Sequence, residues 1–101
     1  MGTAKKKRLP ELPAELLRAL ARLDDPEAIG QVMNELLTPS EVEALGERWE
    51  IMKRLSAGQS QREVAAELSV SITTVSRGSR QLKYGQGGFQ VAQGALASRR
   101  G

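Results

Sequence analysis

The chain has 101 residues, the size of one small domain, and its 15 Lys and Arg against 12 Asp and Glu give a net charge of +3. It contains neither Cys nor His, so disulfides and thiolate metal sites are excluded, and the usual zinc ligands and the commonest general base are missing. The sequence therefore predicts a protein that is not an enzyme and has no cofactor. No apolar run approaches the roughly 18 residues of a membrane-spanning helix, so a cytoplasmic location is also predicted.

The distribution of residue types indicates an all-α fold. Aromatic residues make up 3% of the chain, and nothing resembles alternating β-branched strands flanked by turn dipeptides. Basic residues gather at both ends and in the segment 60–83, whereas acidic residues concentrate between Glu11 and Glu50. The pattern predicts a flexible basic arm over residues 1–10, a single helical domain over residues 11–97 and a disordered tail over residues 98–101.

Two short helices are predicted first. Leucines at helical spacing form an apolar stripe over residues 13–23. Asp25 and Pro26 then begin a second helix, because Asp caps a helix and Pro tolerates its first position. A second apolar stripe covers residues 29–37. Since the two stripes exceed what a small monomer can cover, we expect an intertwined homodimer.

A longer third helix is predicted from Thr38 to about Ala57. Thr38 and Pro39 suit the cap and the first helical position, and Gly58 is a typical C-terminal stop. The apolar residues of this helix spread over more than one face, which is typical of a central helix packed on both sides. We expect one side to contact the segment that follows and the other to contact the leucine-rich helices or a second subunit.

The segment 60–83 has the pattern of a helix-turn-helix. Ser60 and Glu63 can form a capping box for a first short helix. Its apolar face consists of Val64, Ala65 and Leu68. Ser71 can cap a second helix. Three residues of that helix are expected to face the core: Ile72, Val75 and Leu82.

The other face of the second helix is small, hydroxylated and basic, with Thr73, Thr74, Ser76, Arg77 and Arg80. Short side chains allow close approach to a major groove, hydroxyls and methyls can touch base edges, and arginines can pair with guanine or phosphate. DNA binding is therefore the leading hypothesis. The alternative is a helical protein-interaction module, which would lack the steep salt dependence of binding to duplex DNA.

The chain beyond Lys83 begins with a glycine-rich break over residues 84–88. A last helix is predicted from Phe89 to Ala97. It is expected to be weak, because its apolar residues are few.

Two motifs at this separation resemble the tryptophan (Trp operon) repressor family. They are LTPSEVEALGERWEIMKRL, which begins at Leu37, and SQREVAAELSVSITTVSRGSRQLK, which ends at Lys83. The resemblance implies a transcriptional repressor, an all-helical intertwined homodimer that binds double-stranded operator DNA when L-tryptophan occupies a pocket between the third helix and the recognition helix. Two recognition helices about 34 Å apart would read a palindrome.

The resemblance also implies the ligand-binding residues. The indole of L-tryptophan would lie between the guanidinium groups of Arg48 and Arg77, which stack well on an indole and can neutralise the ligand carboxylate. The other matching positions are Leu37 and Thr38, expected from the partner subunit, and Met52, Gly78 and Gln81.

Positions that match the DNA contacts of the family lie on both helices of the helix-turn-helix: Gln61, Arg62, Ile72, Thr73, Thr74 and Ser76. Arg80 and Lys83 are added to this set because of their charge. Each of these two residues has a plain alternative as a solvated surface charge.

The sequence also departs from the family pattern. The family serine near the ligand's amino group is Gln81 here, and Glu35 replaces an apolar residue expected to approach the pocket from the partner subunit. Tyr84-Gly85 followed by Phe89 is similar to a related branch of repressor-like proteins, in which the Arg-Gly-Ser segment is absent and tryptophan binding is not expected. The alternative within nucleic-acid binding is therefore a Trp-repressor-like regulator with no tryptophan response.

Overall fold

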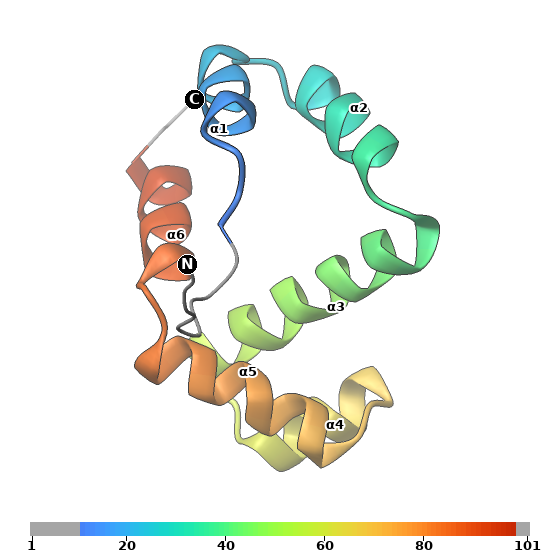
Figure 1. Cartoon of the computed structure of the whole chain (residues 1–101). Helices are drawn as coiled ribbons and strands as arrows, with labels where there is room; N and C mark the ends of the chain where they lie inside the picture. Colours follow the sequence, from blue (N-terminus) through green and yellow to red (C-terminus); the bar gives the residue numbers. More distant parts are fainter. Residues whose placement is uncertain (1–10, 99–101) are drawn as a thin grey trace, which may run out of the picture. The chain divides into compact units, whose positions relative to one another are not determined.

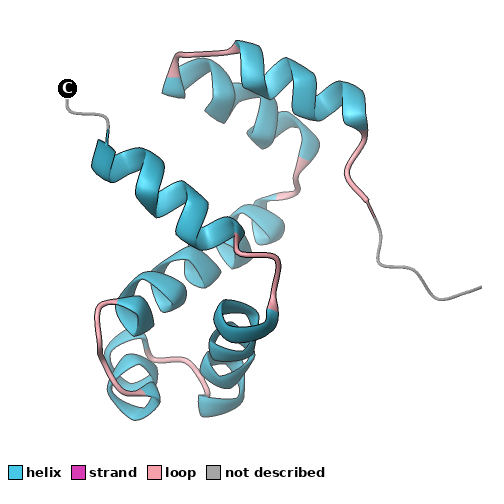
Figure 2. Cartoon of the chain, turned by 90° about the vertical axis from the view of Figure 1, so that its left-hand side faces the viewer, coloured by secondary structure: helices cyan, strands magenta, loops and turns pink. Residues whose placement is uncertain are grey.

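The computed structural model describes residues 11–98, which form six α-helices and no strand (Figures 1 and 2). The helices are α1 (Ala14–Arg22), α2 (Pro26–Leu36), α3 (Pro39–Ser56), α4 (Gln61–Leu68), α5 (Ile72–Tyr84) and α6 (Gly88–Ser98). The predicted all-α fold is confirmed. None of the described helices is long and apolar enough to cross a membrane.

The chain divides into two compact units, residues 1–39 and residues 40–101. The prediction of one domain over residues 11–97 stays a prediction. The predicted basic arm, residues 1–10, and residues 99–101 of the predicted tail lie outside the described residues. Ser98 belongs to the end of α6 rather than to the tail.

The first unit contains α1 and α2, and its local structure follows the predicted signals. The carboxylate of Asp25 accepts a hydrogen bond from the backbone N–H of Glu27 at 3.2 Å, and Pro26 occupies the first position of α2. No residue of either helix is buried. Leu17 and Leu36 expose 47% and 59% of their surface, and the other apolar residues of the two stripes are half-buried.

Helix α3 begins at Pro39 and ends before Gly58, whose φ of +104° is a conformation that glycine adopts without strain. The helix is packed on two sides, but the second contact comes from α6, whereas the leucine-rich helices or a second subunit were expected there. Ile51 is 1% exposed and faces the helix-turn-helix. On the opposite side the ring of Trp49 contacts the ring of Phe89 on α6, with centroids 4.9 Å apart.

Helices α4 and α5 lie side by side and form the predicted helix-turn-helix (Figure 1). Ser60 and Glu63 complete the capping box of α4 with bonds of 3.1 and 2.9 Å. The hydroxyl of Ser71 accepts a hydrogen bond from the N–H of Thr74 and caps α5. The connection turns through Ser69, which adopts a left-handed conformation with φ of 57°.

The core of the second unit is formed by one residue from each of three helices: Ile51 of α3, Val64 of α4 and Val75 of α5. The prediction that Ile72 also faces the core is wrong, because its side chain is 48% exposed. Helical side chains lean towards the N-terminal end of their helix, and Ile72 is the first residue of α5. Its side chain therefore extends past the helix end, where no preceding turn shields it.

A polar network joins the end of α3 to α4. Arg54 forms an ion pair with Glu67 of α4 and another with Glu50, and Gln59 donates to Glu67 at 3.2 Å. Hydrogen bonds from Lys53 and Arg54 hold the pKa of Glu50 below its ordinary value. The ionised carboxylate of Glu50 therefore stabilises the folded protein at pH values above its ordinary pKa. This stabilisation is lost as the pH falls through the lowered pKa.

Candidate functional site

A pocket of about 490 Å³ lies between α3 and α5. Its α3 wall consists of residues at helical spacing: Ala44, Glu47, Arg48, Ile51 and Met52. Its α5 wall consists of Thr74, Arg77, Gly78 and Gln81, with Arg80 at the side. Positions separated by three and four residues share one helix face, so one face of each helix builds the pocket. Its volume is within the range of small-molecule sites.

Gly78 of α5 lies against Ile51 of α3, and both residues line the pocket. A Cβ built on Gly78 would lie 2.7 Å from Cγ2 of Ile51, a distance that side chains do not tolerate. Ile51 is fully buried and cannot move aside. Gly78 is therefore required for close packing of the two helices, in addition to its predicted place in the pocket.

The structure brings together five of the predicted ligand-binding residues. They are Arg48, Met52, Arg77, Gly78 and Gln81, and all of them line the pocket. The other two, Leu37 and Thr38, lie between α2 and α3 and do not line the pocket within the chain. Their contribution from a partner subunit stays a prediction.

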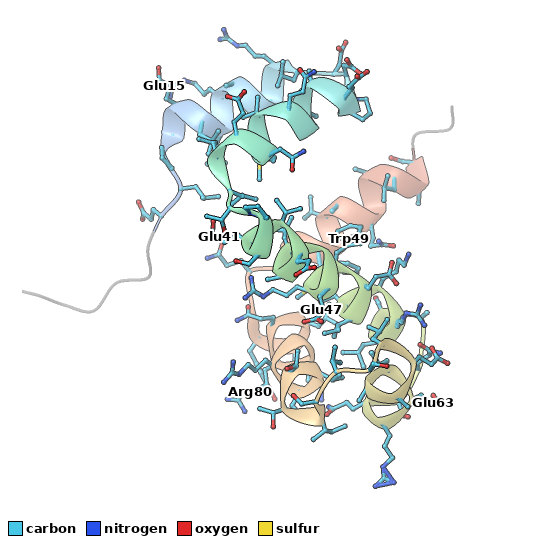
Figure 3. All side chains as sticks on the ribbon, turned by 90° about the vertical axis from the view of Figure 1, so that its right-hand side faces the viewer. Glu15, Glu41, Glu47, Trp49, Glu63 and Arg80 are labelled. Atoms are coloured by element: carbon cyan, nitrogen blue, oxygen red, sulfur yellow. The ribbon has the colours of Figure 1, made fainter. Side chains whose placement is uncertain are left out.

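The sequence analysis missed several residues of the pocket wall. Ala44 and Glu47 of α3 line the pocket but were not predicted to do so. Arg80 of α5 lines it as well, although its charge led to a prediction of DNA contact. Helical spacing from Arg48 could have identified Ala44. Figure 3 shows Glu47 on α3 and Arg80 on α5.

The charges of the pocket are unbalanced. Three guanidinium groups, those of Arg48, Arg77 and Arg80, line it together with one carboxylate, that of Glu47. Within residues 11–98, none of these four side chains takes part in an ion pair. The pocket therefore carries two excess positive charges that no side chain of residues 11–98 neutralises through an ion pair, and it favours an anionic ligand group.

The residues predicted to contact DNA divide into two groups. Five have exposed side chains: Arg62, Ile72, Thr73, Arg80 and Lys83. The other three are partly buried and bonded within the helix-turn-helix. The hydroxyl of Ser76 donates to Oε1 of Gln61 at 2.8 Å, and the hydroxyls of Thr74 and Ser71 are 2.9 Å apart. The Ser76–Gln61 bond joins α5 to α4.

The chain is similar in sequence to known proteins of one family. A model of the Trp repressor protein family matches residues 13–96. A Trp operon repressor homolog of Xylella fastidiosa (strain M23) is 38% identical over 69 residues, which are 67% of this chain and 75% of the relative. Another, from Photobacterium profundum, is 42% identical over 73 residues, which are 69% of this chain and 66% of the relative.

Two further similarities extend the comparison. The uncharacterized protein YerC of Bacillus subtilis is 28% identical over 78 residues, which are 77% of this chain and 75% of YerC. The crystal structure of a Staphylococcus aureus protein described as a Trp repressor has a TM-score of 0.74 at 24% identity, covering 87% of this chain and 88% of that chain. The similarity to the Staphylococcus aureus structure shows that the two chains share a fold.

Proposed function

Because the chain belongs to the Trp repressor family, we propose that this DNA-binding regulator is a homodimeric repressor that binds a palindromic operator with L-tryptophan as corepressor. One observation carries the proposal. Helix α5 carries both sets of residues: Arg77 and Gly78 line the pocket, and Ile72 and Thr73 in its first turn are exposed. A ligand in the pocket therefore touches the helix that would enter the major groove.

The chemistry of the pocket suits L-tryptophan. Arg48 and Arg77 come from different helices, so their flat guanidinium groups can approach an indole from two sides. The excess positive charge favours the ligand carboxylate. The apolar part of the wall, which includes Met52 and Ile51, provides contact for the rings.

The uncovered apolar surface supports the proposed dimer. Leu17 and Leu36 of the first unit and Leu45 of α3 expose between 47% and 59% of their surface. Val91 and Leu96 of α6 expose 72% and 65%. Burying such side chains against a second copy contributes roughly 1.5–3 kcal/mol for each side chain that becomes fully buried. Two recognition helices in the dimer would then match two half-sites.

The ligand acts, in this proposal, by favouring the arrangement of α5 that fits DNA. Only a difference in ligand affinity between the two arrangements can shift their populations. A coupling of about 1–3 kcal/mol, which corresponds to a 5-fold to 150-fold change in DNA affinity, is typical of such systems.

The alternative is a repressor-like regulator that does not respond to tryptophan. The similarity to YerC, over 77% of this chain, gives no support to tryptophan as the ligand, since YerC is uncharacterized. The DNA-binding part of the proposal is common to both.

The test is a titration of the full chain with L-tryptophan by calorimetry, which avoids optical interference from Trp49. We expect saturable binding of about one ligand per chain. If no heat of binding were measured at two temperatures and equilibrium dialysis confirmed the result, L-tryptophan would be excluded as the ligand. The proposal of a DNA-binding regulator would remain. Duplexes selected from a random pool, with and without L-tryptophan, are used to measure the salt dependence of DNA binding, and a slope near zero would contradict DNA binding.

Two substitutions on the exposed face are expected to separate base reading from phosphate contact. Thr73→Ala should change the preference among selected duplexes without changing ligand affinity. Arg62→Ala should weaken binding to all duplexes about equally and reduce the salt slope by about 1. Fluorescence anisotropy on a panel of single-base variants measures both effects. A uniform loss of affinity in the Thr73→Ala variant would show that Thr73 does not read a base.

A further inference from the structure

The pocket contains one acidic side chain among three basic ones, and that arrangement selects a class of ligand. Glu47 lies on the same face of α3 as Ile51, one helical turn before the point where α3 meets α5. Glu47 is exposed to solvent and at the same time lines the pocket.

Glu47 has no competing partner within the described residues. No hydrogen bond or ion pair joins its carboxylate to another described side chain, whereas Glu50 further along α3 is paired with both Lys53 and Arg54. The carboxylate is thus available to a ligand. Gln81 also offers an amide oxygen at the pocket, but that oxygen carries no charge and bonds a cation less strongly.

We infer that Glu47 accepts the α-ammonium group of the ligand and makes the pocket selective for an amino acid over the corresponding carboxylic acid without the amino group. This inference rests on the proposed tryptophan site. The arginines bind the ligand carboxylate, and Glu47 is the one negative group of the pocket wall that can pair with the ammonium. A zwitterion therefore matches both signs of charge in the pocket.

The same charges predict what happens with a ligand that has no ammonium group. Indole-3-propionate keeps the indole and the carboxylate of tryptophan, but it leaves Glu47 unpaired and places its own negative charge near that carboxylate. The wild-type protein should therefore bind L-tryptophan at least tenfold more tightly than indole-3-propionate.

The experiment measures both ligands by calorimetry on three proteins: the wild type, Glu47→Gln and Glu43→Gln. Glu47→Gln removes the charge and keeps the shape and helix propensity. Glu43→Gln is the matched control, because it removes the same charge one turn earlier on α3 and does not line the pocket. Circular dichroism of each variant verifies that the helices are retained.

We expect Glu47→Gln to reduce the preference for L-tryptophan about tenfold, through weaker binding of L-tryptophan and unchanged or tighter binding of indole-3-propionate. Glu43→Gln should keep the wild-type preference. An unchanged preference in Glu47→Gln would overturn the role of Glu47 while leaving the tryptophan site intact. If neither ligand bound the wild type, the proposed tryptophan response would fail, and the inference would fail with it.

Discussion

An Arg48→Ala, Arg77→Ala double variant is expected to lose L-tryptophan binding by a factor of 100 or more and to lose ligand-dependent DNA binding with it. Each arginine makes a charge-assisted or stacking contact with the ligand in our proposal, and such a contact contributes about 1.5–3 kcal/mol. The two residues lie on different helices of one pocket. Calorimetry with L-tryptophan and anisotropy with a selected duplex measure the two losses.

A control that removes two arginines elsewhere distinguishes the pocket from general charge. Arg18 and Arg22 are exposed on α1, and their replacement by alanine should leave ligand affinity unchanged. Arg77→Lys keeps the charge but loses the planar group, so it should restore only part of the affinity that Arg77→Ala removes. Unchanged ligand affinity in the single Arg77→Ala variant would exclude Arg77 from the ligand site.

Gly78→Ala is expected to destabilise the protein, although alanine is the better helix former by about 1 kcal/mol. The added Cβ would lie 2.7 Å from Cγ2 of Ile51, and overpacking of this kind costs about 1–3 kcal/mol. Since Ile51 is 1% exposed, α5 must move away from α3, which widens the pocket floor. We expect a net loss of about 1 kcal/mol in urea unfolding, together with weaker ligand binding.

A second substitution tests the cause. Ile51→Leu removes the methyl branch at Cβ that the new alanine would meet, and it changes stability by less than about 1.5 kcal/mol. Gly78→Ala should therefore be better tolerated in the Ile51→Leu background. Gly94→Ala on α6, where nothing lies within 4 Å of the added Cβ, should gain stability. Equal effects of Gly78→Ala in both backgrounds would contradict the proposed clash, provided that protein concentration is held constant.

The sequence determined most of the secondary structure, because the signals that begin and end helices are local. Asp25, Ser60 and Ser71 accept backbone hydrogen bonds within three residues of their own position, and Gly58 ends α3 through its own φ. Such interactions depend only on chain neighbours, so a reading of the sequence can find them. The periodic residues Val64 and Val75 likewise face the core as predicted.

The motifs also identified five residues of the pocket wall, but this depended on the resemblance to the repressor family rather than on periodicity. Spacing alone does not specify which face of α3 meets which face of α5. Taken singly, Arg48 and Arg77 have the pattern of ordinary solvated arginines, and only the tertiary structure shows that they line one pocket.

Tertiary structure alone decided the remaining features, because each depends on residues distant in the chain. The contact of Gly78 with Ile51, the ring contact of Trp49 with Phe89 and the ion pair of Arg54 with Glu67 arise where two helices meet. Such contacts leave no periodic signal in either segment. The place of Glu47 at the pocket wall follows from the same cause: apolar periodicity identifies the face of a helix that can be buried, whereas helix packing decides which part of that face is covered.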